Sequence, residues 1–238
     1  MEQIPTNRRR FLKGALAGGA VAVSVALPNT APAESKLAAG AKASNLNPAY
    51  LFFNMEEQSF IEAVVNHMIP ADALSPKGTE IGVNIYIDHA LANGWGKGER
   101  LYNHGPWKTG LPTQGYQLPL TPAELYRVCI TKANIACVER HGRPFEQLSE
   151  AQRQDFLLAL SAGKIDFKDG PSSKTFFDML YQNVMEGMFS DPIYGGNQNK
   201  SGWKLIGFPG AISMHARDVE TYLDKRYTAP MFGISDLS

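Results

Sequence analysis

Cysteine is scarce in this sequence of 238 residues, which contains only Cys129 and Cys137. Neither C-x-x-C nor C-x-x-C-H occurs, so there is no local motif for an iron–sulfur cluster, a redox-active thiol pair or covalently attached haem. The two cysteines fall in one expected helix, eight residues apart, which separates them by about 12 Å along its axis. A disulfide requires Cα atoms within roughly 7 Å, so these two cysteines do not pair with each other.

Net charge is also missing, because 23 basic residues balance 23 acidic ones. A neutral chain lacks the basic footprint of a nucleic-acid-binding protein. No G-x-G-x-x-G fingerprint follows an expected strand, no G-x-S-x-G is present, and none of the five histidines forms H-x-x-x-H or H-E-x-x-H. We therefore expect no catalytic centre, cofactor site or metal site in this chain; a site assembled from distant residues stays an alternative.

Long uncharged stretches are absent except near the N-terminus, where Gly14–Leu27 is apolar and free of charge. A basic region precedes this run, Pro28 ends it, and Ala31–Ala33 has the A-x-A form of a signal-peptidase site. The run is short for a membrane span. Residues 1–33 are therefore predicted to be a cleaved signal sequence, with an uncut membrane anchor as the alternative.

The basic region carries a more specific pattern. It matches the twin-arginine export signal at Arg8, Arg9, Phe11, Leu12 and Lys13. The twin-arginine route exports folded proteins, and it serves proteins that take up a cofactor, or a partner, before export. We therefore expect a periplasmic protein, although the sequence offers no cofactor motif that explains this route.

Residues 34–50 are predicted to be a flexible linker, and residues 51–238 a single all-α domain of about five helices with two long aromatic or glycine-rich loops. Residues 82–94 fit a strand alternation as well as a helix, and helix is favoured because no partner strands are expected elsewhere. Capping residues and apolar residues spaced three or four apart mark the helices. The expected helical segments are 52–70, 82–94, 121–142, 148–164 and 172–190, followed by a short amphipathic tail at 213–227.

The two long loops, at 94–120 and 191–211, are rich in aromatic residues, glycine and proline. Loops of this length are uncommon in compact domains unless they are functional. Large apolar side chains on loops often mark a surface that another protein covers.

The second loop, DPIYGGNQNKSGWKLIGFPGA, gives the sequence a specific resemblance. Together with the leader, the helical body and the L…EQ.F…V…MIP.D opening, it resembles the gluconate 2-dehydrogenase subunit 3 family, also called the gamma or small subunit. The resemblance implies an FAD-containing catalytic large subunit and a multihaem cytochrome c subunit as partners. FAD and haem c then belong to those partners.

The resemblance also implies a role in export. The flavoprotein of such complexes typically lacks an export signal, and the small subunit carries it through the twin-arginine translocase. The complex is then expected in the periplasm, on the outer face of the inner membrane. Related complexes oxidise glucose, sorbitol, fructose or 2-ketogluconate, so the resemblance does not fix the sugar.

The glycine-rich loop is the expected partner interface, because glycines allow close backbone approach and aromatic residues dominate interfaces. The alternative is that its rings pack on the chain's own domain as an Ω-loop. The predicted interface residues are Tyr194, Gly195, Gly196, Trp203, Lys204, Phe208 and Pro209.

In an exported protein, an unpaired cysteine is either buried and inert or bonded to another chain. Cys137 is nearer the helix end than Cys129 and precedes the charged Glu139 and Arg140. We therefore expect Cys137 to reach the surface more readily, as a candidate for an intersubunit disulfide. Two small core residues are the alternative.

Two other function classes remain open from the sequence. One is a stand-alone periplasmic helical ligand-binding protein, with the Trp95–Tyr116 loop as a lid over its ligand. The other is an enzyme whose active site is assembled from scattered histidine and aspartate residues.

Overall fold

The computed structural model describes residues 49–102, 104–108, 110–211, 216–228 and 230–237. The predicted signal sequence and the linker up to residue 48 lie outside these ranges. Within them the fold is all-helical, as expected, with seven α-helices rather than about five and no strand. The one β-type contact is an isolated bridge between Gly210 and Phe232.

Three of the helices begin with capping boxes. In a capping box, the side chain of the N-cap residue accepts the backbone N–H of the residue three positions later, and the side chain of that residue accepts the backbone N–H of the N-cap. These are α2 (Met55–Met68), α4 (Pro122–His141) and α5 (Glu150–Ser161). The box pairs are Asn54 with Glu57, Thr121 with Glu124, and Ser149 with Gln152. Short polar side chains in the sequence thus set the start of each helix.

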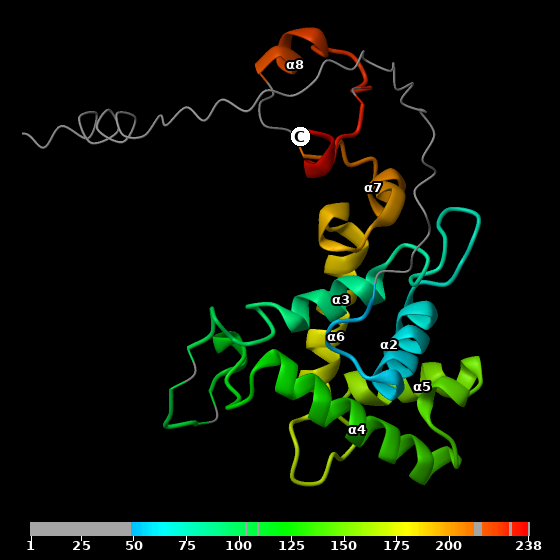
Figure 1. Cartoon of the computed structure of the whole chain (residues 1–238), viewed down its shortest axis with the longest axis vertical. Helices are drawn as coiled ribbons and strands as arrows, with labels where there is room; N and C mark the ends of the chain where they lie inside the picture. Colours follow the sequence, from blue (N-terminus) through cyan, green and yellow to red (C-terminus); the bar gives the residue numbers. More distant parts are fainter. Residues whose placement is uncertain (1–48, 103, 109, 212–215, 229, 238) are drawn as a thin grey trace, which may run out of the picture. The chain divides into compact units, whose positions relative to one another are not determined.

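The core lies where α2, α4 and α5 pack with α3 (Val83–Ala92) and α6 (Ser173–Phe189). α6 contacts α3, α4 and α5 and runs through the middle of this group (Figure 1). Fully buried aromatic rings fill the centre, and Tyr126 meets Phe176 edge-on at 5.6 Å between ring centroids. The Tyr126 hydroxyl donates to Asn183 Oδ1 at 2.7 Å, so this buried polar group is satisfied.

Two shorter helices follow α6: α7 (Ser201–Ile206) and α8 (Ala216–Thr221). α7 lies in the segment expected to be a loop, and α8 covers only part of the expected amphipathic tail. The 94–120 segment is irregular, as expected, apart from a 3-10 turn at Pro112–Gln114. No helix among the described residues is long and apolar enough to cross a membrane.

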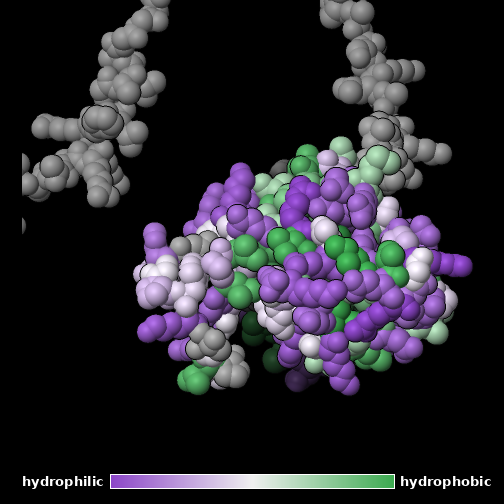
Figure 2. Space-filling model, turned by 90° about the horizontal axis from the view of Figure 1, so that it is seen from below, coloured by the Kyte–Doolittle hydropathy of each residue, from purple (hydrophilic) through white to green (hydrophobic). Residues whose placement is uncertain are grey.

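Seen from below the view of Figure 1, hydrophobic residues lie in small groups between hydrophilic ones (Figure 2). The exposed apolar residues of α4 and α5 include Ile135, Val138 and Leu158. Single exposed apolar residues are normal on a protein surface, so these need no partner to explain them.

Candidate partner-binding surface

The glycine-rich segment at 191–211 folds as two 3-10 turns and one helix. The turns are η3 (Pro192–Tyr194) and η4 (Gln198–Lys200), and α7 follows directly. The Asp191 carboxylate caps η3 by accepting the Ile193 N–H at 3.0 Å. Elements of three to six residues are too short to show a periodic pattern, which is why the sequence appeared irregular.

Asn197 holds this segment to the end of α6. Its side chain is fully buried, and its backbone adopts a left-handed conformation with φ of 47°. The Nδ2 group donates to Ser190 O at 2.8 Å, and Oδ1 accepts the Gly202 N–H at 2.8 Å. One amide side chain therefore joins the C-terminal end of α6 to the first turn of α7.

Trp203 packs inward from α7 and is only 4% exposed. Its indole N–H donates to Phe189 O at 2.7 Å, which satisfies both the indole and a carbonyl at the end of α6. The Phe208 ring meets it edge-on, with centroids 5.2 Å apart.

Two glycines allow the backbones to approach this closely. A Cβ on Gly196 would lie 2.2 Å from Gly187 O in α6, and a Cβ on Gly202 would lie 2.0 Å from Met188 O. Real Cβ atoms do not reach such distances to backbone oxygen, so any other residue would force the segment away from α6. These glycines therefore serve packing within the chain.

Other side chains of the same segment face solvent. The exposed apolar ones are Ile193, Tyr194, Leu205, Ile206 and Phe208, with exposures from 41% to 59%. Large apolar groups are enriched at protein interfaces, and these five lie within sixteen residues of sequence, which makes the segment a candidate interface. We refer to these five, with Phe232 and Ile234 described next, as the α7 surface.

The C-terminal segment is attached beside this region by backbone contacts. Ala211 N donates to Phe232 O at 2.7 Å, and Ile234 N donates to Asp191 Oδ2 at 2.8 Å. Lys200 Nζ donates to Met231 O at 3.0 Å. These contacts bring Phe232 and Ile234, 40% and 43% exposed, to the glycine-rich segment.

An ion pair between Lys200 and Asp236 completes the attachment. The Lys200 hydrogen bond, with the Gly233 N–H, lowers the pKa of the Asp236 carboxyl below its ordinary value. Asp236 is therefore charged at neutral pH and keeps the C-terminal turn on the glycine-rich segment.

The structure divides the predicted interface residues into two groups. Tyr194, Lys204 and Phe208 are exposed, Gly195 and Pro209 are half-buried, and Gly196 and Trp203 are buried. The exposed residues are accessible from solvent, and the buried ones close the chain's own fold. That a partner covers the exposed group stays a prediction.

Sequence reasoning missed Leu205, Ile206, Phe232 and Ile234. The first two lie in the six-residue helix, which is less than two turns long. The other two reach this region through contacts more than twenty residues away in sequence. No local pattern in the sequence signals that attachment.

Both cysteines lie on the buried face of α4. Cys129 and Cys137 are free and each 0% exposed, so the expectation that Cys137 reaches the surface is wrong for the chain by itself. Burial raises the pKa of each thiol to about 12, because the thiolate is poorly solvated there. An intersubunit disulfide through Cys137 stays a prediction that requires α4 to open locally.

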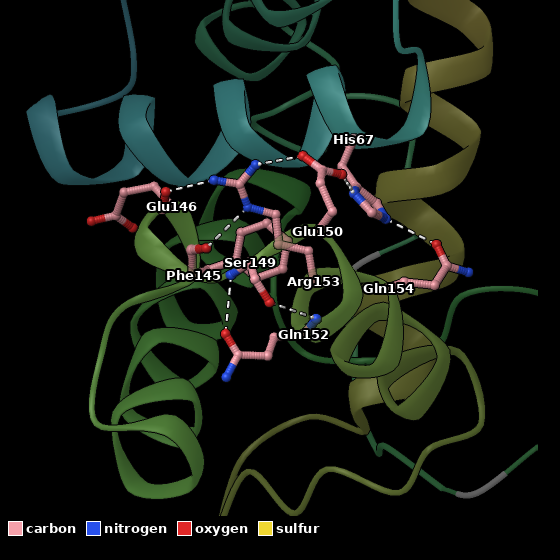
Figure 3. A network of polar contacts seen from close by, with 8 residues as sticks. All are labelled: His67, Phe145, Glu146, Ser149, Glu150, Gln152, Arg153 and Gln154. Carbon is pink, nitrogen blue, oxygen red and sulfur yellow. Dashed lines mark hydrogen bonds and ion pairs between the residues drawn. The ribbon is translucent and has the colours of Figure 1, made fainter.

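His67 links two helices through its side-chain hydrogen bonds (Figure 3). Its Nδ1 lies 2.8 Å from Glu150 Oε2 and its Nε2 lies 2.9 Å from Gln154 Oε1, which joins α2 to α5. Arg153 of the same network donates to Glu146 O at 2.6 Å. Across the part of the chain that the structure describes, no group of three or more His, Cys, Asp or Glu residues is placed to hold a metal ion.

Two hollows lie beside residues 163–173, one of about 90 Å³ and one of about 310 Å³. Lys132, Asp166 and Phe167 are among the residues that line the smaller one. Neither hollow is lined by a residue of the Trp95–Tyr116 loop, which was the lid expected for a ligand-binding protein.

The comparison with protein families supports the subunit class among those left open by the sequence. The family described as gluconate 2-dehydrogenase subunit 3 matches residues 55–210, about two thirds of the chain. The chain belongs to this family. The match begins at α2 and ends with the glycine-rich segment, so it includes Trp203, Asn197 and most of the α7 surface.

Family membership confirms the resemblance and makes the chain a subunit-type protein of a gluconate 2-dehydrogenase complex, which implies catalytic partner subunits. No curated protein and no solved structure matches the chain. The C-terminal residues after 210, with Phe232 and Ile234, lie outside the family match.

Proposed function

We propose that this chain is the non-catalytic small subunit and export chaperone of a periplasmic FAD-dependent dehydrogenase that oxidises gluconate or a related sugar or polyol. Its partners are a flavoprotein catalytic subunit and a multihaem cytochrome c subunit. The family match carries this proposal, because the family is named as one subunit of a dehydrogenase.

The cofactors belong, in this proposal, to the partner subunits. The common dinucleotide-binding fold for FAD begins with a strand and a glycine-rich turn. The sequence has no such fingerprint, and the described residues form helices without a strand. Covalent haem c requires C-x-x-C-H, which the sequence lacks.

The export role rests on the leader. The twin-arginine pattern at Arg8, Arg9, Phe11, Leu12 and Lys13 is a signal for export of folded proteins. A chain with this signal and no cofactor motif gains from the route if a cofactor-loaded partner travels with it. The complex then works in the periplasm, on the outer face of the inner membrane.

The α7 surface is the proposed contact with the flavoprotein. It combines exposed apolar side chains with a rigid support, because Trp203, Asn197 and two glycines fix its backbone to α6. A preorganised surface loses less conformational entropy on binding than a mobile loop does.

Co-purification tests the subunit role. The chain, tagged at its C-terminus and purified from the periplasm of its own cells, is expected to bring a flavoprotein with about one FAD per small chain and dye-linked gluconate or sugar oxidation. The purified chain without that partner is expected to be colourless. A chain that purifies alone from cells with active dehydrogenase, or that itself binds stoichiometric flavin, contradicts the proposal.

A further inference from the structure

A dense set of polar contacts holds the chain where the predicted linker ends, from its last residue, Tyr50, onwards. The Asp88 carboxylate of α3 is fully buried and accepts three successive backbone N–H groups. The distances are 2.5 Å from Leu51 N, 3.0 Å from Phe52 N and 2.8 Å from Phe53 N. Hydrogen bonds to a charged acceptor are stronger than neutral ones, and a buried carboxylate depends on them.

α4 holds the same residues from a second direction. Arg127 donates to Phe52 O at 2.6 Å, and its guanidinium carbon lies 4.1 Å from the centroid of the Phe52 ring. Arg127 also forms an ion pair with Glu57, a buried residue in the first turn of α2. Phe52 is therefore held at its backbone N–H, its carbonyl and its ring.

The residue before these, Tyr50, is held by α2 and α3. Its hydroxyl donates to Glu62 Oε1 at 2.6 Å and accepts from Asn84 Nδ2 at 2.6 Å. Phe53 is buried among the core aromatics, with its ring centroid 6.3 Å from that of Tyr126.

Four consecutive residues are thus fixed by three helices, through contacts to groups up to 75 positions away in sequence. The four residues that make these contacts are consecutive. A force applied at residue 49 therefore has to break several of these contacts before it reaches the first turn of α2. The set exists only when α2, α3 and α4 are already packed, because each helix supplies part of it.

We propose that residues 50–53, with Asp88 and Arg127, form a clamp that isolates the helical body from force applied through the N-terminal side of the chain. The clamp prevents α2 from unravelling when the preceding segment is pulled. Its use in export, where the leader is drawn across the membrane ahead of a folded body, rests on the proposed function; the clamp itself does not.

An ATP-driven unfoldase coupled to a protease tests the clamp, because it pulls a substrate from whichever end carries the recognition tag. The full chain is tagged at either the N-terminus or the C-terminus, and the rate of degradation is measured for each. No export machinery or flavoprotein is present. Failure of the clamp is therefore distinguishable from failure of the proposed function.

The test variant is Asp88→Asn, and the matched control is Asp191→Asn. Asp191 also accepts backbone N–H groups through its carboxylate, from Ile193 and Ile234, but it holds the C-terminal segment. Both substitutions remove one buried or half-buried charge with little change in shape. Tyr50→Phe is the milder second variant, since it removes only a hydroxyl, and it replaces Asp88→Asn if that chain does not fold.

Asp88→Asn is expected to speed degradation from the N-terminal tag about tenfold, the rate change for about 1.4 kcal/mol, and from the C-terminal tag about twofold or less. Tyr50→Phe is expected to show the same end preference with a smaller increase. Asp191→Asn is expected to leave N-terminal degradation unchanged. Equal acceleration from both ends, or none from the N-terminal tag, overturns the proposal.

Discussion

Trp203 and Phe208 touch each other, yet one is buried and the other is exposed. The same glycine-rich segment thus contains residues that close the fold and residues that face solvent. A residue's type in this segment does not show which group it belongs to. Its hydrogen bonds and its exposed fraction do. Substitution of a buried residue is expected to lower the stability of the fold, and substitution of an exposed one to weaken partner binding.

Trp203→Ala is expected to lower the free energy of unfolding by about 3–5 kcal/mol, because it leaves a cavity and removes the hydrogen bond to Phe189 O. Trp107→Ala is the matched control: this ring is 40% exposed, so a loss of about 1 kcal/mol or less is expected. Chemical denaturation of the unsubstituted chain and the two variants measures both losses in the free energy of unfolding. Equal losses for the two variants contradict the packing described for α7.

The buried thiols predict a pH dependence. With a pKa of about 12 in the folded chain, Cys129 and Cys137 are expected to react with iodoacetamide at pH 8 at least a hundredfold more slowly than in urea. Burial raises the pKa of both thiols from 9.0 to about 12. The contribution of the two protonated thiols to the free energy of unfolding is therefore complete below about pH 9 and is lost as the pH rises towards 12. Labelling of the Cys129→Ala chain isolates Cys137. Rapid labelling of folded Cys137 contradicts its burial and favours the surface role expected from sequence.

At the scale of elements, helices with polar caps were predictable and short elements were not. α2, α4 and α5 begin directly after the N-caps Asn54, Thr121 and Ser149, within the expected segments 52–70, 121–142 and 148–164, because an N-cap bonds residues only three positions ahead. α7 was missed because its support comes from outside its own segment: Trp203 bonds Phe189 O at the end of α6, and Asn197 bonds Ser190 O just after it.

The candidate surface was predictable only in part, for the same reason. Tyr194, Lys204 and Phe208 were selected from composition and are exposed. Gly196 and Trp203 were selected by the same reasoning and are buried, since nothing in the sequence shows the α6 backbone that they meet. Phe232 and Ile234 join the surface through hydrogen bonds of their backbone groups with Ala211 and with the Asp191 carboxylate, which are distant in sequence. Composition does not show these contacts.

Ile206→Glu is expected to weaken binding of the flavoprotein at least tenfold, about 1.4 kcal/mol, because a charge then faces the apolar centre of the interface. Leu158→Glu on α5 is the control, since Leu158 is exposed to a similar degree, 56% against 59%. Binding of each purified variant to the flavoprotein is measured by biolayer interferometry, and circular dichroism verifies that each is folded. Equal binding by both variants shows that the contact lies elsewhere.

The whole molecule combines a sequence pattern that predicts folded export, a helical body of the subunit 3 family and an apolar surface supported by α6. Each feature explains something that the others leave open. The predicted leader raises the question of a cofactor, and the family match implies catalytic partner subunits, which we propose hold it. The exposed side chains are the proposed place to bind one of them.

The central claim is that this chain carries its flavoprotein out of the cytoplasm, and replacing Arg8 and Arg9 with lysine tests it most directly. Arg10→Lys is the matched control, because it removes an arginine next to the pair and leaves the pair intact. Cell fractionation with measurement of FAD-dependent dehydrogenase activity gives the location of the flavoprotein in each strain. The account predicts that Arg8→Lys with Arg9→Lys retains both chains in the cytoplasm, with the flavoprotein loaded with FAD, while Arg10→Lys exports both. A flavoprotein that still reaches the periplasm with the doubly substituted leader would contradict the account.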